Sequence, residues 1–356
     1  MNIFPVIAVG TSTISSSGEM LDVRYDLIQF KDEQKVEPPT DVGHLSYFHF
    51  DDTFELYQDC KNFSEDEMKD WYWKNIDDGC AVDHIPPDKP ENYMDGRVCI
   101  IHLLEKDEPV ISIEDAYLKL YLLSLRHAKP NSLNLDGIFD ALPNIAWTNN
   151  GPMYPHDLSC ADEGEISIAH HKKTYIKSLD KFPCLTDYVI PSGVRIADAS
   201  RVRLGAYLSE GTTVMHEGFV NFNAGTLGPA MIEGRISAGV VVGANSDLGG
   251  GCSTMGTLSG GNDVKISIGE DCLLGANSGL GIPLGDRCIV EAGLYLTAGT
   301  KVEVLNEDNK LVKTVKASEL SSKDDQLFIR NSLTGAIQCK PNRKKVSLND
   351  QLHTND

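Results

Sequence analysis

The stretch MHEGFVNFNAGTLGPAMIEGRISAGVVVGANSDLGGG, residues 215–251, decides the fold of this 356-residue chain. Through it, aliphatic or small residues recur at intervals of six. They are Val214, Val220, Thr226 and Ile232, followed after one step of four by Ile236, Val242 and Leu248. Neither the period of an α-helix nor that of a strand produces this spacing, which is typical of the hexapeptide β-helix. Each hexapeptide is predicted to form a short strand and a corner, with three to a triangular coil and the aliphatic side chain inside.

The repeat extends beyond this stretch in both directions. It begins at Ile190, resumes at Ile268 after an interruption, takes a second step of four at Leu284 and ends at Val302. Of the 31 glycines, 22 fall within residues 193–299, where they suit corners that need positive φ. The interruption GGGCSTMGTLSGGNDVKIS predicts a loop extruded from the solenoid. Because loops on rigid scaffolds often bind ligands, we expect this one to fold over a ligand or a neighbouring subunit; a flexible insertion is the alternative.

Four segments are predicted along the chain. Residues 1–110 form an N-terminal α/β domain, with strand-like stretches at 4–10, 24–30, 45–50 and 97–105. Residues 111–187 form a helical and loop connector that contains a helix over Glu114–His127 and then a short helix plus loop. Residues 188–305 form the β-helix, with the extruded loop at about 250–266, and residues 306–356 form a short C-terminal segment and tail.

Composition limits the possible partners. The chain has 32 basic and 52 acidic residues, a net charge of −20, which argues against binding to nucleic acid or to an anionic membrane surface. No apolar run approaches the length of about 20 residues that spans a bilayer. The nine cysteines are odd in number, scattered and without a CxxC motif, so reduced, buried thiols in a cytoplasmic protein are expected.

Four stretches together carry a family resemblance: the one quoted first, GTLSGGN (256–262), ISIGEDCLLGANSGLGIPLGDRCIVEAGLYLTAGTKV (266–302) and LFIRNSLTGAI (327–337). They resemble the tetrahydrodipicolinate N-succinyltransferase family of hexapeptide-repeat acyltransferases, in its longer actinobacterial and pseudomonad form. The resemblance implies a left-handed β-helix and a homotrimer with active sites between subunits. It also implies transfer of succinyl from succinyl-CoA to the amine of tetrahydrodipicolinate, as L-2-amino-6-oxopimelate, in lysine and diaminopimelate biosynthesis.

The family resemblance points to Glu233, in MIEGRIS, as the catalytic carboxylate. Its role, as general base or as the carrier of a transient acyl anhydride, stays open from sequence. Many hexapeptide acetyltransferases use a histidine as base instead. His216 is the only histidine between residues 190 and 302, and Glu217 could orient it, so His216 is the alternative.

The resemblance also implies a set of residues that bind succinyl-CoA, because they match family positions along the CoA groove. Arg235 is expected to hold the succinyl carboxylate through its forked guanidinium, and Lys316 and Arg330 suit the phosphates. The full set is Arg235, Gly250, Ser253, Ala276, Glu291, Ala292, Gly299, Lys316, Ile329, Arg330, Asn331 and Ser332.

A magnesium site is a further implication. Glu217 matches a residue that helps to bind Mg²⁺ near the trimer axis in part of the family. The second expected ligand, an aspartate, is replaced here by Ser200, and Asp198 nearby would face differently. Mg²⁺ is therefore only a possible cofactor.

Three other functions are alternatives to succinyl transfer. The runner-up is another hexapeptide-repeat acyl-CoA N-acyltransferase with a different amine acceptor. A zinc enzyme of the γ-carbonic anhydrase sort needs three imidazoles, which one histidine in the repeat cannot supply. A non-catalytic solenoid would show a more regular, uninterrupted array.

Overall fold

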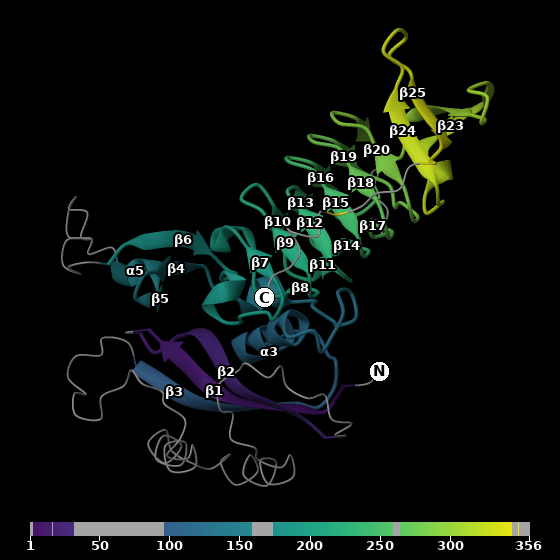
Figure 1. Ribbon diagram of the computed structural model, residues 1–356. Helices are drawn as coiled ribbons and strands as arrows, with labels where there is room; N and C mark the ends of the chain where they lie inside the picture. The colour runs from purple at the N-terminus through teal and green to yellow at the C-terminus, as the bar shows by residue number, and fades with distance from the viewer. Residues whose placement is uncertain are drawn as a thin grey trace. The chain divides into compact units, whose positions relative to one another are not determined.

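The computed structural model describes residues 3–15, 17–31, 96–158, 174–258, 264–343 and 348. The chain divides into two compact units (Figure 1). One unit comprises Met1–Tyr121 and Leu133–Pro183, and the other comprises Leu122–Ser132 and Cys184–Asp356.

The first unit contains an antiparallel sheet of three strands in the order β2-β1-β3. They are β1 (Val6–Ile14), β2 (Met20–Phe30) and β3 (Gly96–Leu104). These strands confirm the strand-like stretches at 4–10, 24–30 and 97–105, whereas the stretch at 45–50 lies outside the described residues.

The predicted helix is confirmed as α3 (Ile113–Ser124). It ends before the predicted His127, at a point where Arg126 takes a positive φ of 66°. Within the first unit it buries Lys119, whose Nζ donates to Asp107 Oδ1 at 2.8 Å and to the Asn134 carbonyl at 2.6 Å. An ion pair together with carbonyl acceptors is what allows a lysine to be buried.

The segment that follows differs from the expected short helix plus loop. After α4 (Ile138–Ala141), β4 (Ile145–Thr148) and β5 (Gly151–Met153) form an antiparallel hairpin, which β6 (Ile176–Asp180) extends in the order β5-β4-β6. A short helix, α5 (Pro155–Leu158), follows β5. The hydroxyl of Thr148 closes the turn, accepting from Asn150 N and donating to the Gly151 carbonyl. The polar NNG turn was therefore a hairpin signal, and the loop prediction was wrong here.

The second unit is a parallel β-helix with three faces, as the repeat predicts (Figure 1). Face 1 stacks β7 (Arg195–Ile196), β9 (Thr212–Val214), β12 (Ala230–Ile232), β15 (Ser246–Leu248), β18 (Leu273–Leu274), β20 (Ile289–Val290) and β24 (Gln326–Arg330). Face 2 stacks β10 (Phe219–Val220), β13 (Arg235–Ile236), β16 (Ser253–Thr254), β19 (Gly279–Leu280) and β21 (Tyr295–Leu296). Face 3 stacks β8 (Ala206–Leu208), β11 (Ala224–Thr226), β14 (Val241–Val242) and β17 (Ser267–Ile268). Two short 3₁₀ helices, η3 (Leu185–Asp187) and η4 (Ala199–Arg201), lie near the first coil.

The predicted inward series forms the core of the β-helix. From Val202 to Val302 its aliphatic members are between 0% and 3% exposed. The prediction is wrong for Ile190, which is 89% exposed. It precedes β7, the first strand of face 1, so no earlier strand covers it, and Ile196 beside it is only half-buried.

The first step of four is a shortened corner between face 1 and face 2. Only Glu233 and Gly234 separate β12 from β13. The preceding coil has four residues at this corner, 215–218, and the following coil also has four, 249–252. The second step of four shortens the corner between β19 and Leu284, where face 2 meets face 3.

The extruded loop lies at the border between face 2 and face 3, between β16 and β17. Its base is closed by the bridge between Thr257 and Lys265 and by a hydrogen bond from Leu258 N to the Val264 carbonyl. It therefore begins after Thr254 and not near residue 250. Gly250 and Ser253, which we expected inside the loop, lie in a regular corner and in β16.

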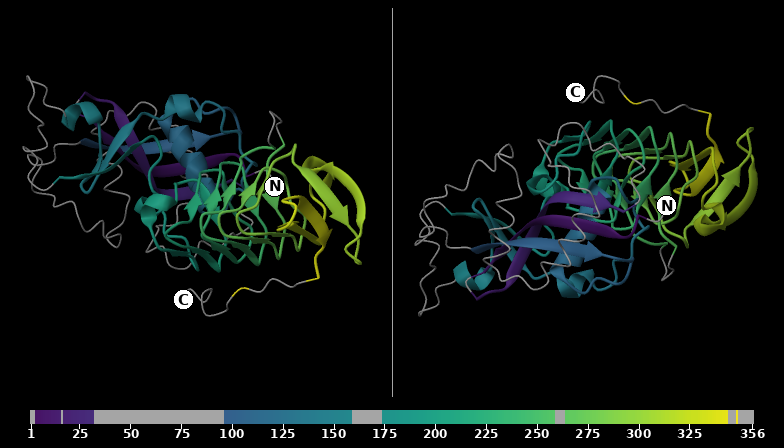
Figure 2. Two further views of the ribbon diagram at one scale, coloured as in Figure 1. Left: turned by 90° about the horizontal axis from the view of Figure 1, so that it is seen from above. Right: turned by 90° about the horizontal axis from the view of Figure 1, so that it is seen from below.

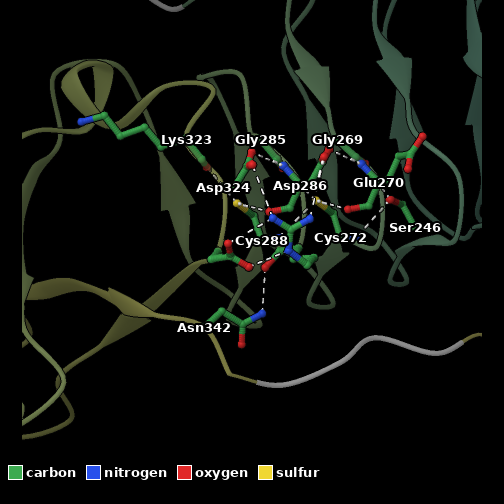
Figure 3. A network of polar contacts seen from close by, with 12 residues as sticks. Ser246, Gly269, Glu270, Cys272, Gly285, Asp286, Cys288, Lys323, Asp324 and Asn342 are labelled. Atoms are coloured by element: carbon green, nitrogen blue, oxygen red, sulfur yellow. Dashed lines mark hydrogen bonds and ion pairs between the residues drawn. The ribbon is translucent and has the colours of Figure 1, made fainter.

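Buried thiols belong to a polar ladder along the inner side of face 1 (Figure 3). Cys272 N donates to Ser246 Oγ at 3.0 Å, and Cys288 N donates to Cys272 Sγ at 3.3 Å. Each ladder side chain in turn donates to a corner carbonyl, Ser246 to Gly269 at 2.9 Å and Cys272 to Gly285 at 3.1 Å. None of the five cysteines whose side chains are described forms a disulfide, and four of them are buried, as the sequence predicts.

The β-helix ends in a small sheet that continues face 1 (Figure 2). β22 (Lys301–Leu305) pairs with β23 (Leu311–Lys316) and with β25 (Ile337–Pro341), and β25 pairs with β24. The 3₁₀ helix η5 (Ala317–Leu320) follows β23. No helix in the described part of the chain is long and apolar enough to cross a membrane.

Candidate active site

The residues selected from sequence lie on face 2 and its two borders, which we call the site face. The border with face 1 carries Glu217, Glu233, Gly250, Ala276, Glu291 and Ala292, and Ile329–Ser332 follow it in the last coil. Arg235 and Ser253 lie on face 2 itself, on β13 and β16. Gly299 lies on the border with face 3, and Lys316 is close to it because Ala317 N bonds to the Thr300 carbonyl.

Two carboxylates converge where the corner is short. A Cβ built on Gly250 would lie 3.2 Å from Glu217 Oε2 and 3.7 Å from Glu233 Oε2. The three residues come from consecutive coils, and the missing two corner residues in the middle coil leave the carboxylates space to approach Gly250. The backbone of Glu233 is fixed, since its N donates to the Leu248 carbonyl and its carbonyl accepts from Gly251 N.

A buried thiol lies beneath this corner. Cys252 is 1% exposed, and a Cβ on Gly234 would lie 2.2 Å from its Sγ, so only glycine fits at 234. Burial, followed by the charges of Asp247 and Glu233, raises the pKa of the Cys252 thiol to about 12. The thiol is therefore neutral near pH 7, and it packs the corner without acting as a nucleophile.

Arg235 lies in register with Ser253 on face 2. Its Nε and one terminal nitrogen donate to Ser253 Oγ at 3.1 Å and 2.6 Å. The side chain is exposed, so Ser253 holds a solvent-facing guanidinium along the strand-stacking direction, beside the carboxylate corner. Such a fork can bind a carboxylate.

The last coils carry two exposed cations on opposite borders of the site face. Arg330 N donates to Glu291 Oε2 at 2.7 Å, and its guanidinium reaches the Gly335 carbonyl at 3.4 Å. Lys316 N donates to Glu319 Oε1 at 3.0 Å. Four strand spacings, about 19 Å, separate the coil of Glu233 from β24, which carries Arg330.

The geometry does not support the magnesium prediction. Asp198 Oδ1 accepts from Ser200 N at 3.0 Å and from Ser200 Oγ at 2.6 Å, and these hydrogen bonds lower the pKa of the Asp198 carboxyl. Among the described residues no group of three His, Cys, Asp or Glu side chains could hold a metal. Glu217 instead points toward Gly250 and Glu233. His216 is exposed on the same corner as Glu217.

Sequence reasoning missed the convergence of Glu217 and Glu233 on Gly250. It assigned Glu217 to a metal and Glu233 to catalysis, because the two lie sixteen positions apart. The signal was the step of four in the repeat, since a corner shortened by two residues brings the side chains of neighbouring coils together.

Comparison with known proteins covers most of the chain. Residues 49–140 match the family described as tetrahydrodipicolinate N-succinyltransferase N-terminal, residues 142–183 match its middle domain, and residues 265–298 match the hexapeptide repeat of succinyl-transferase. A 2,3,4,5-tetrahydropyridine-2,6-dicarboxylate N-succinyltransferase of Pseudomonas aeruginosa is 61% identical over 255 residues, which is 71% of this chain and 73% of that one. The enzyme of the same name from Vibrio cholerae is 56% identical over 269 residues, 76% of this chain and 77% of its own.

A solved structure gives the same result for the fold. A Campylobacter jejuni protein described as a 2,3,4,5-tetrahydropyridine-2-carboxylate N-succinyltransferase superposes with a TM-score of 0.73 at 31% identity. The match covers 98% of this chain and 94% of that one. Together with the hexapeptide-repeat match, it confirms the left-handed parallel β-helix.

Proposed function

The chain belongs to the tetrahydrodipicolinate N-succinyltransferase family, and we propose that the carboxylate corner of the site face carries out the family reaction. The enzyme transfers succinyl from succinyl-CoA to the amine of tetrahydrodipicolinate, in its open form L-2-amino-6-oxopimelate, within lysine and diaminopimelate biosynthesis. The observation that carries the assignment of the site is the convergence of Glu217 and Glu233 on Gly250, beside Arg235.

Glu233 is the general base in this proposal. The amine nitrogen attacks the thioester carbonyl carbon, and Glu233 takes the proton that the nitrogen loses. The C–S bond then breaks, and the CoA thiolate takes that proton from Glu233 and leaves as a thiol. Glu233 has a fixed backbone and is half-buried, which suits a proton transfer that needs a defined geometry. His216 is the weaker candidate because it is exposed on the neighbouring corner.

The cations of the site face suit the anionic donor. Arg235 binds the succinyl carboxylate next to Glu233, and Arg330 and Lys316 bind the CoA phosphates in the last coils. The separation of about 19 Å between these ends matches an extended pantetheine arm lying along stacked strands. In a chain of net charge −20, these local cations have to supply the attraction.

The active enzyme is a cytoplasmic homotrimer with its sites between subunits. Glu217 and Arg235 are exposed in one chain, yet acyl transfer to an amine competes with hydrolysis and requires that water be excluded. A second copy placed over the site face would exclude it. The buried free thiols support a reducing compartment. The residues of one chain do not fit Mg²⁺, so no step here involves a metal.

A direct assay tests the proposal. Purified protein is mixed with succinyl-CoA and tetrahydrodipicolinate, and release of the CoA thiol is followed, with acetyl-CoA as the comparison donor. The Glu233→Gln variant is expected to lower kcat at least about 100-fold, because it removes the proton acceptor. Glu270→Gln, an exposed glutamate at another corner, is the matched control.

Three results would contradict parts of the proposal. Equal rates with acetyl-CoA would overturn the assignment of the donor. Normal turnover in Glu233→Gln would move the base elsewhere. Release of one equivalent of CoA per site without acceptor would replace the general-base role by an acyl anhydride on Glu233.

A further inference from the structure

The outward side of face 2 is a column of residues in register. Strand pairing aligns Phe219 with Arg235, Arg235 with Ser253, Ser253 with Gly279, and Gly279 with Tyr295. The alternate residues of the same strands point into the core. Whatever lies along the site face between its two borders therefore contacts this column.

The ring of Tyr295 lies directly over Gly279. A Cβ built on Gly279 would lie 2.0 Å from two carbons of the Tyr295 ring, and its three nearest atoms all belong to that ring. The backbone of Gly279 is not in the left-handed region, so the turn does not require glycine there. Glycine is needed at 279 because the ring occupies the space above it. Tyr295 nevertheless stays 44% exposed.

Arg235 approaches the same point from the other end of the column. Its guanidinium donates to Ser253 Oγ, so it leans toward the C-terminal coils, whereas the Tyr295 ring leans back over Gly279. The guanidinium thus lies against Ser253 and the aromatic ring over Gly279, while the backbones of Arg235 and Tyr295 are three strand spacings, about 14 Å, apart. An extended chain with a carboxylate at one end and an apolar group farther along fits that separation.

We propose that Tyr295 binds the pantoate part of the CoA arm, with its ring against the gem-dimethyl group. The proposal rests on the succinyl transfer proposed above. Pantoate is the apolar part of CoA nearest to the phosphates. Tyr295 lies in the coil whose corners carry Glu291 and Gly299, next to the coil of Arg330. An exposed ring at that position offers apolar contact at little conformational cost.

Donors of different length test the contact. Tyr295→Ala is assayed with succinyl-CoA, succinyl-pantetheine and succinyl-N-acetylcysteamine, which lacks pantoate. The KM for the first two donors is expected to rise about tenfold with kcat unchanged, as for loss of roughly 50 Å² of apolar contact. The KM for the short donor is expected to stay at its wild-type value. Tyr295→Phe, which keeps the ring, is expected to behave as wild type.

Gly279→Ala provides an independent test. The three atoms nearest to the added methyl all belong to the Tyr295 ring, which has to be displaced, so this variant is expected to show the same donor-dependent rise in KM. In the double variant with Tyr295→Ala the two effects are not expected to add, because both remove one contact. Leu227→Ala is the control, since Leu227 is 45% exposed and follows β11 on face 3.

Each other result overturns the assignment. An equal loss with all three donors, or a change of oligomeric state on sedimentation, would make Tyr295 a structural or subunit-interface residue. A rise in KM for succinyl-CoA but not for succinyl-pantetheine would show that the ring contacts the nucleotide instead of pantoate. Unchanged KM values in an active enzyme would refute only the contact between Tyr295 and pantoate. Absence of succinyl transfer in the wild type would refute the proposed function, and this contact with it.

Discussion

At the scale of single residues, the site depends on three glycines that leave space for neighbouring side chains. Gly250 leaves room for Glu217 and Glu233, Gly234 leaves room for the Cys252 thiol, and Gly279 leaves room for the Tyr295 ring. None of these three glycines has a positive φ. Their need for glycine is therefore spatial and not conformational, which is why a count of glycines in the repeat could not separate them from the corner glycines.

Gly250→Ala tests the spatial argument. The methyl would lie 3.2 Å from the Glu217 carboxylate, which has to move by a few tenths of an ångström, and in ordinary contact with Glu233 at 3.7 Å, while no backbone strain is added. We expect kcat to fall about 10-fold, because the carboxylate beside Glu233 is displaced by a fraction of an ångström. The melting temperature is expected to stay close to that of wild type. Full turnover, or a large loss of stability, would show that Gly250 serves the fold alone.

At the scale of elements, the repeat predicts most of the second unit. The buried positions from Val202 to Val302 follow from spacing, because in a prism each inward side chain is covered by the coils on either side. The same reason explains the failure at Ile190, which has no coil before it. The start of the loop was misplaced because Gly249–Gly251 look like a linker but form a regular four-residue corner.

The site depends on the length of the corner between β12 and β13. Inserting two glycines between Glu233 and Gly234 would give this corner the four residues that its neighbours have. The coils are expected to stay stacked, and the circular dichroism spectrum to stay unchanged, because that length fits the coils on both sides. Displacement of Glu233 should lower turnover at least about 100-fold.

The matched control places the same two glycines between Asp308 and Asn309, in the exposed turn that joins β22 to β23. This insertion is expected to preserve turnover. If both insertions preserved it, the short corner would have no role in catalysis.

At the scale of the whole molecule, the first unit marks the limit of sequence reasoning. Three of its strands and one helix were recognisable, but no motif connected residues 1–110 to a function. The family match over residues 49–140 and the solved structure that covers 98% of the chain assign the region to the family. Pairing between distant strands, as between β1 and β3, leaves no local spacing in the sequence, whereas a solenoid repeats its contacts every coil.

Assembly is the prediction at this scale. Sedimentation equilibrium is expected to give three times the chain mass of 39.0 kDa. Activity per chain should fall when dilution dissociates the trimer, because one chain leaves Glu217 and Arg235 open to water. The Glu233→Gln variant should assemble normally, which separates assembly from chemistry. A monomer with full specific activity would contradict the placement of sites between subunits.

The stacking of coils has a consequence for how such an enzyme can diversify. The proposed base and the cations proposed to bind the phosphates lie on different coils, and each coil contacts only its neighbours, so the distance between the two ends is set by a whole number of coils. Duplication or loss of one coil, which is three hexapeptides, between Glu233 and Arg330 would change the length of acyl carrier that the enzyme accepts by one strand spacing, while the residues at both ends keep their surroundings. The number of coils between the two ends thus sets the length of donor that the β-helix accepts.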